Sequence, residues 1–169
     1  MPIGDFTAGR EYTIFKFPAP RYPGAPVNFA VLICFEDTFP ELSRRFVDRG
    51  ANFLVNITND AWFKRTSAPY QHLSASVFRA VENRRFLVRA ANTGVSAFIS
   101  PSGRVRPLVS LRDGKEIFTE GTETGFVYGR GIKTFYTRYG DWFVLLCLFS
   151  FIYGIIKRWV RARQAKKTL

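Results

Sequence analysis

The sequence predicts an α/β domain followed by one apolar helix near the C-terminus. Two apolar runs, Asn28–Phe35 ("NFAVLICF") and Ala51–Asn59 ("ANFLVNITN"), flank an amphipathic stretch, as in a parallel strand–helix–strand unit. A third run, Trp142–Ile156 ("WFVLLCLFSFIYGII"), carries no charge. With 169 residues, of which 47% are hydrophobic, the chain can form one packed domain.

The first half of the chain supplies the strands that we expect at the centre of the sheet. The Pro- and Gly-rich N-terminal region predicts loops around one short strand, Glu11–Phe17, in which apolar and polar residues alternate. The runs Asn28–Phe35 and Ala51–Asn59 are predicted to be strands buried on both faces. Pro40–Gly50 is the helix between them, because Pro suits a first helical turn and Gly a C-terminal cap.

The second half predicts one further helix and then hairpins. Apolar residues recur at helical spacing in Gln71–Phe86. "FLVRAAN" (86–92) and "VSAFISPSGRVRPLV" (95–109) are predicted as adjoining strands, with a hairpin turn at Pro101–Gly103. Residues 114–121 and 124–130 are predicted as weaker edge strands.

The uncharged run near the end predicts a membrane span. Fifteen residues are fewer than the roughly 20 that a span needs, but the flanking aromatics extend it to 139–159. Six Lys or Arg residues and no acid follow within 157–169, as is typical of a cytoplasmic flank. We therefore expect a domain at 1–135, a transmembrane helix at 139–159 and a basic cytoplasmic tail at 160–169. The alternative is a buried core helix.

Composition excludes several classes of function. The net charge is +12, but half of it lies in the tail rather than on a face of the domain, which argues against a nucleic-acid partner. Two cysteines in unlike segments predict no disulfide framework, and with one histidine they predict no metal site and no cofactor. No N-terminal signal peptide is visible.

Cys34 is the candidate nucleophile. It ends a buried strand, and a helix begins within six residues, so helix-terminal N–H groups favour its thiolate form and can hold an oxyanion. Glu36 follows as an acid that could orient a partner or tune the thiol. A small buried structural cysteine remains the alternative on these residues alone.

A wider pattern supports the nucleophile. "ICFEDTFPELSRRFVDRGANFLVNITNDAWF" (33–63) resembles the nucleophile region of the nitrilase, or carbon–nitrogen hydrolase, superfamily, and "RAVENRRFLVRAANTGVSAFISPSGRV" (79–105) extends the match. Within that superfamily the chain is most similar to the apolipoprotein N-acyltransferase family of membrane enzymes. "PIGDFTAGREYTIF" (2–15) also resembles that family's segment ahead of the nucleophile strand.

The resemblance implies the C-terminal half of a nitrilase-like α-β-β-α sandwich followed by one transmembrane helix. It implies a phospholipid:apolipoprotein N-acyltransferase that moves a fatty acyl chain through a Cys thioester to the N-terminal diacylglyceryl-cysteine amine of lipoproteins. The partners would be a phospholipid acyl donor, the apolipoprotein and the membrane. The location would be the bacterial inner membrane, with the α/β domain periplasmic.

The resemblance also implies site residues. Cys34 would be the nucleophile and Glu36 a supporting acid, while Phe35, Asn59, Asp60 and Trp62 would bind substrate. From the residues alone, Asn59-Asp60 could equally form a tight turn.

The family's catalytic Glu and Lys precede the Cys, and neither Glu11 nor Lys16 matches their context. We therefore expect this chain to need a missing N-terminal half, to expose one apolar face of its sheet and to be inactive alone. The alternatives are a membrane-anchored nitrilase-type amidase and an inactive truncated remnant.

Three smaller predictions concern the helix at 71–86 and the strand after it. His72 is expected to bond local backbone at the helix start. Glu82 and Asn83 are expected to close the helix and brace the neighbouring strand. The arginines of this region are expected to form a solvated basic face: Arg79, Arg84, Arg85 and Arg89.

Overall fold

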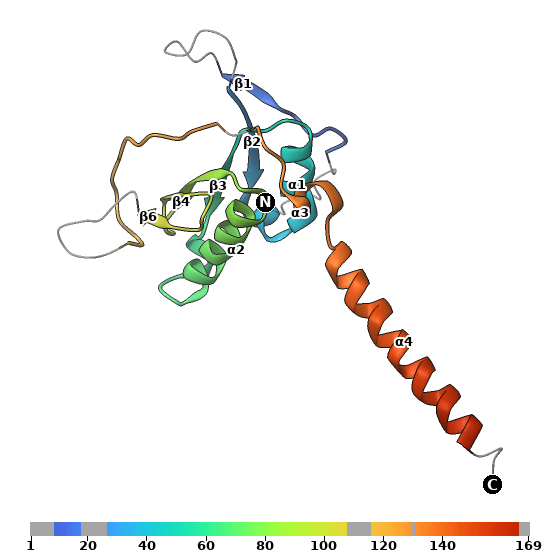
Figure 1. The fold of residues 1–169 in the computed structure, drawn as a ribbon. Helices are drawn as coiled ribbons and strands as arrows, with labels where there is room; N and C mark the ends of the chain where they lie inside the picture. Colours follow the sequence, from blue (N-terminus) through green and yellow to red (C-terminus); the bar gives the residue numbers. More distant parts are fainter. Residues whose placement is uncertain (1–8, 18–26, 108–115, 130, 166–169) are drawn as a thin grey trace. The chain divides into compact units, whose positions relative to one another are not determined.

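The computed structural model describes residues 9–17, 27–107, 116–129 and 131–165. The chain divides into two compact units, Met1–Arg138 and Tyr139–Leu169. The first is a mixed α/β unit, as predicted, and the second is dominated by one helix (Figure 1).

The first unit is built on one six-stranded sheet with its strands in sequence order. β2, β3 and β4 run parallel at its centre, and the outer strands β1, β5 and β6 pair antiparallel. The strands are β1 (Phe15–Phe17), β2 (Val27–Ile33), β3 (Phe53–Asn59), β4 (Phe86–Asn92), β5 (Ala97–Ile99) and β6 (Val105–Pro107). The parallel centre brings the carboxyl ends of β2, β3 and β4 to one edge.

Helices lie between the parallel strands, as a crossover connection requires. They are η1 (Cys34–Thr38) and α1 (Pro40–Asp48) between β2 and β3, and η2 (Ala61–Phe63) and α2 (Ala68–Asn83) between β3 and β4. A short helix, α3 (Phe135–Tyr139), follows β6 in the chain. α1 begins at Pro40 and is followed by Gly50, whose φ of 108° suits only glycine.

The hydrophobic core lies between one face of the sheet and helices α1 and α2. The strands contribute Ala30, Leu32, Leu54 and Leu87, all fully buried, and Phe46 and Val47 of α1 pack against them. Packing against this face positions both helices beside the strand ends, where the candidate site lies.

The opposite face of the sheet is apolar but only partly covered. Ile33 and Ile57 are 59% and 46% exposed at the ends of β2 and β3. Phe15, Phe29 and Phe53 form a stack across three strands, with ring centroids 5.2 and 5.3 Å apart. The prediction that the central strands are buried on both faces is therefore wrong, because α1 and α2 pack on the other face alone.

Several element boundaries differ from prediction. β1 is limited to three residues, and α2 begins three residues earlier than expected, at Ala68. The hairpin turn at Pro101–Gly103 is confirmed by a bond of 2.9 Å from the Gly103 amide to the Ser100 carbonyl. The edge strands predicted after 114 are absent from the described residues 116–129.

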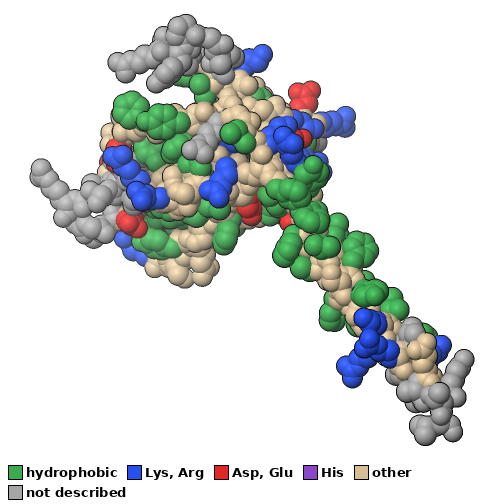
Figure 2. Space-filling model, in the orientation of Figure 1, with side chains coloured by type: hydrophobic (Ala, Val, Ile, Leu, Met, Phe, Trp, Pro, Cys, Tyr) green, Lys and Arg blue, Asp and Glu red, His purple; other side chains and the backbone are tan. Residues whose placement is uncertain are grey.

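The second unit contains α4, Trp142–Ala165. Its segment Trp142–Trp159 is long and apolar enough to cross a membrane, and none of that segment is buried. Both the membrane span and the alternative of a buried core helix remain predictions. Hydrophobic side chains cover α4, and Lys and Arg side chains gather toward its C-terminal end (Figure 2). Lys166 and Lys167 of the predicted tail lie outside the described residues.

Candidate functional site

The predicted site residues meet at the carboxyl edge of the three parallel strands. Cys34 follows β2 directly, Asn59 ends β3 and Asp60 follows it. The Asn59 side chain links the strand ends, because its carbonyl oxygen accepts bonds from the Ala61 amide (3.1 Å) and the Asn92 side chain (3.2 Å). This edge is where α/β sheets of parallel strands place their ligands.

Cys34 occupies a strained turn. Its φ of 51° is left-handed, a conformation that costs a non-glycine residue about 1–2 kcal/mol. The side-chain amide of Asn56 holds this turn by donating to the carbonyl oxygens of Leu32 (3.2 Å) and Cys34 (3.1 Å). The half-buried thiol is thereby lifted off the end of β2, as a nucleophile requires.

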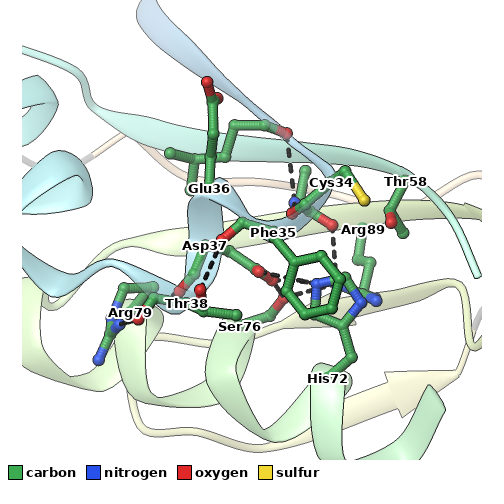
Figure 3. Close-up of polar contacts among 12 residues, drawn as sticks. Cys34, Phe35, Glu36, Asp37, Thr38, Thr58, His72, Ser76, Arg79 and Arg89 are labelled. Carbon is green, nitrogen blue, oxygen red and sulfur yellow. Dashed lines mark hydrogen bonds and ion pairs between the residues drawn. The ribbon is translucent and has the colours of Figure 1, made fainter. Parts of the chain in front are cut away.

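Glu36 clamps the same turn from its outer side. Its carboxylate accepts a bond of 2.7 Å from the backbone N–H of Ile33, the last residue of β2 (Figure 3). The acid therefore braces the backbone on either side of Cys34. Its predicted role as a supporting acid remains a prediction.

Four charged side chains form a closed ring beneath the turn, which we call the buried ring: Asp37, His72, Asp60 and Arg89. The His72 imidazole bridges the two carboxylates, 2.9 Å from Asp37 Oδ1 and 2.9 Å from Asp60 Oδ1. The Arg89 guanidinium bridges them again, 3.0 Å from each. All four are buried, with His72 the most exposed at 4%.

Neutral side chains tie the buried ring to the sheet. Arg89 donates to Asn56 Oδ1 at 2.7 Å, and Ser76 of α2 donates to Asp37. Thr58 donates to Asp60 at 3.1 Å. Because Asn56 also holds the Cys34 carbonyl, a continuous chain of hydrogen bonds joins the ring to the candidate nucleophile.

The buried ring favours a protonated His72. Burial alone lowers the pKa of His72, but the hydrogen bonds to Asp37 and Asp60 outweigh it and raise the pKa from 6.5 to about 9. Burial likewise opposes ionisation of Asp60, yet the bonds from His72 and the charge of Arg89 hold the pKa of Asp60 below its usual value. The protonated His72 therefore lies between the carboxyl groups of Asp37 and Asp60.

Aromatic side chains cover His72 on the solvent side. The Phe35 ring stacks on the imidazole with centroids 4.8 Å apart, and Phe63 meets Phe35 edge-on at 5.7 Å (Figure 3 shows Phe35 over His72). These residues, with Thr38, Ala68 and Gln71, line a hollow of about 300 Å³. The hollow offers an apolar wall beside the turn.

The other predicted substrate residues differ in exposure. Trp62 is 78% exposed, whereas Asp60 is fully buried and its carboxylate is engaged by His72, Thr58 and Arg89. Gly94 packs so closely against Asp60 that a Cβ there would clash with the Asp60 carboxylate. The substrate-binding roles of Phe35, Asn59, Asp60 and Trp62 remain predictions.

Two expectations for this region are wrong. His72 lies one turn inside α2 and bonds two distant carboxylates rather than local backbone. Three of the four arginines are buried rather than solvated: Arg79 donates to the Asp37 and Thr38 carbonyls, Arg85 to the Ala51 carbonyl, and Arg89 closes the ring. Only Arg84 lies on the surface.

Sequence reasoning missed Asn56, Asp37 and Ser76. The signal was present in β3 and β4, where Asn56 and Arg89 each follow a run of three apolar residues and are register partners. Polar side chains on the buried face of a strand must be hydrogen-bonded. The described residues contain no group of three His, Cys, Asp or Glu side chains placed to hold a metal ion.

Two curated proteins are similar to this chain over most of its length. The chain is 48% identical over 147 residues to the apolipoprotein N-acyltransferase of Geobacter metallireducens, covering 86% of this chain and 26% of that protein. It is 39% identical over 158 residues to apolipoprotein N-acyltransferase 2 of Treponema denticola, covering 94% and 29%. The chain thus spans little more than a quarter of the length of these curated relatives.

Among solved structures, an amidase from Nesterenkonia sp. is 27% identical with a TM-score of 0.43, covering 61% of this chain and 38% of the amidase. The family model for carbon-nitrogen hydrolases matches residues 6–116, about two thirds of the sequence and the whole of the site described above. The chain therefore belongs to the carbon–nitrogen hydrolase family.

Proposed function

We propose that this chain is the nucleophile-bearing part of a phospholipid:apolipoprotein N-acyltransferase. The observation that carries the proposal is the placement of Cys34, half-buried in a left-handed turn at the carboxyl edge of β2. The names of the relatives supply the reaction, since these proteins are called apolipoprotein N-acyltransferases.

The chemistry is a two-step acyl transfer. The Cys34 thiolate attacks the carbonyl carbon of a phospholipid sn-1 ester, the C–O bond breaks, and the lysophospholipid leaves with a proton. The resulting thioester is attacked by the α-amine of a diacylglyceryl-cysteine. The C–S bond breaks, the amine loses a proton, and the thiolate is regenerated. Sulfur suits both steps because it is a good nucleophile and a good leaving group.

The same proposal includes where in the cell the chain lies. α4 anchors the chain in the bacterial inner membrane, with its basic C-terminal end in the cytoplasm and the α/β unit in the periplasm, where both lipid substrates are accessible. The half-exposed apolar face of the sheet is the surface on which the other half of the α-β-β-α sandwich packs. That half supplies the catalytic Glu and Lys.

The test is a covalent adduct at Cys34. Cells that make the chain together with the half that supplies the Glu and Lys are fed an alkyne fatty acid. The tagged protein is captured from their membranes and treated with hydroxylamine, which cleaves thioesters. We expect a hydroxylamine-labile label that is lost in Cys34→Ser and retained in the matched control Cys147→Ser. A label that survives in Cys34→Ser moves the nucleophile elsewhere.

The molecule that accepts the acyl chain distinguishes an acyltransferase from an amidase-type hydrolase. Adding a synthetic diacylglyceryl-cysteinyl peptide to the labelled membranes should move the label to the peptide amine. Release of the label as free fatty acid, with none on the peptide, would favour water as acceptor and an amidase-type hydrolase. No label in any variant would favour an inactive remnant.

A further inference from the structure

The buried ring contacts the Cys34 turn from below at two points. Asp37 is itself a residue of η1, three positions after Cys34, and both of its carboxylate oxygens are held within the ring. Through Asn56, Arg89 also reaches the Cys34 carbonyl oxygen. A change in the ring is therefore transmitted to the backbone of the candidate nucleophile.

The ring is neutral only when His72 is protonated, since it holds two carboxylates and one guanidinium. The charged groups that face His72 are Asp37 from η1, Asp60 after β3 and Arg89 from β4. On α2 itself, Arg79 is paired with Glu82 and adds no net charge. The Phe35 and Phe63 rings on the remaining side are uncharged.

We propose that the buried ring is a positioning device for Cys34, which holds the nucleophile turn in place and keeps its underside free of net charge. His72 is then a positioning residue rather than a general base, because both its ring nitrogens are engaged by buried carboxylates. This inference rests on the proposed role of Cys34 as the nucleophile.

The physical consequence is electrostatic. Removing the imidazolium leaves one uncompensated negative charge in a buried site, where screening by water is weak. A negative charge beneath Cys34 disfavours its thiolate, which is the reactive form. Restoring neutrality by removing one carboxylate should restore the thiolate even though the imidazole is still missing.

The experiment measures the alkylation rate of Cys34 by iodoacetamide from pH 6 to 10. The protein is purified from membranes in mild detergent, and Cys147→Ser is present throughout, so that Cys34 is its only cysteine. The variants are His72→Gln and the double variant Asp60→Asn/His72→Gln. Arg106→Gln is the matched control, because it removes one positive charge at an exposed pair outside the ring.

We expect His72→Gln to slow alkylation at pH 7.5 about three- to tenfold, with a far-ultraviolet circular dichroism spectrum like that of the parent. The double variant should recover most of the rate, and Arg106→Gln should match the parent. The parent profile should need two ionisations, of which the one near pH 9 is absent in His72→Gln.

Three results would overturn the proposal: a folded His72→Gln that reacts at the parent rate, a folded double variant that stays as slow as the single one, or a parent profile with one ionisation. The last requires no variant, so it decides the question even where His72→Gln fails to fold. The readout is also separate from the acyl adduct. If no adduct forms at Cys34 but the alkylation results hold, the proposed function fails and the ring still positions the thiol.

Discussion

Toward the carboxyl end of the central sheet, polar side chains lie on the helix-covered face and apolar side chains on the partly open face. In β3, Asn56 and Thr58 follow Leu54 on the face that α1 and α2 cover, whereas Val55 and Ile57 point to the partly open face. Asn56 and Thr58 are therefore buried, while the apolar Ile57 between them is 46% exposed. They can be buried because each is hydrogen-bonded. Among the described residues of this unit, α1 and α2 pack on the other face and leave the apolar side chains of the open face partly exposed.

This difference indicates that the two faces perform different tasks. The helix-covered face holds the charged ring that lies beneath Cys34. The open face carries the aromatic stack of β1, β2 and β3, and contiguous exposed apolar surface of this kind marks an interaction surface. The following predictions test the contrast, from the largest expected effect to the smallest.

Replacing Arg89 tests the charged ring most severely. Arg89→Leu removes the guanidinium that pairs with both Asp37 and Asp60, and among the described residues leaves His72 as their one ion-pair partner. Breaking a buried ion pair from one side costs roughly 3–5 kcal/mol. Urea unfolding of the detergent-solubilised protein, followed by circular dichroism, measures the loss. Arg106→Leu breaks an exposed pair and should cost less than about 1 kcal/mol. Equal losses of unfolding free energy in the two variants would mean that the buried ring contributes no more to stability than an exposed ion pair does.

Neighbouring residues of β3 compare the two faces directly. Leu54→Ala removes a fully buried side chain from the core and should lower the free energy of unfolding by roughly 2–5 kcal/mol. Val55→Ala lies on the other face, is only partly buried, and should cost about 1 kcal/mol or less. The same unfolding assay measures both. A larger loss for Val55→Ala would show that the open face is packed in solution.

The protonation of His72 predicts a pH-dependent stability. Because the pKa of His72 is raised from 6.5 to about 9 in the folded protein, its contribution is complete below pH 6.5 and is lost as the pH rises through about 9. The contribution is roughly 3 kcal/mol at most. Melting temperatures between pH 6 and 10 measure it, and His72→Gln should flatten that part of the curve. An unchanged slope in this variant would assign the pH dependence to another group.

Gly94 tests how closely the ring is packed. In Gly94→Ala the new Cβ would clash with the Asp60 carboxylate, so Asp60 must shift, at a cost of roughly 1–3 kcal/mol. Gly131→Ala is the matched control, because a Cβ there meets nothing within 4 Å. Melting temperature measures both variants. If Gly94→Ala is as stable as the control, the contact with Asp60 is easily relieved.

Much of the fold could be predicted from local pattern. The apolar runs predicted β2 and β3, Pro40 and Gly50 predicted the ends of α1, and Pro101–Gly103 predicted the hairpin, because each signal acts over a few residues. The edge strands predicted after residue 114 failed for the same reason. A short alternating run has no strand character unless a neighbouring strand offers it hydrogen bonds.

The candidate site also has one part that could be predicted from local pattern and one part that could not. Cys34 could be identified because its signals lie side by side in the chain: a strand end, a turn and a helix start. The ring could not, since Asp37, His72 and Arg89 lie on three elements and carry no shared spacing. The arginines were expected in solvent because buried arginine is rare without a partner, and their partners are distant in sequence.

The sequence by itself determined the α/β class, the central strands, the position of the nucleophile turn and an apolar helix long enough to span a membrane. Only the tertiary structure decided which face of the sheet is covered, and that His72 and Arg89 lie buried between two carboxylates. The physical reason is that hydrophobic periodicity and turn chemistry are local properties. Charge pairing depends on which elements meet, and α2 meets the end of β3 and the centre of β4 only after the chain has folded.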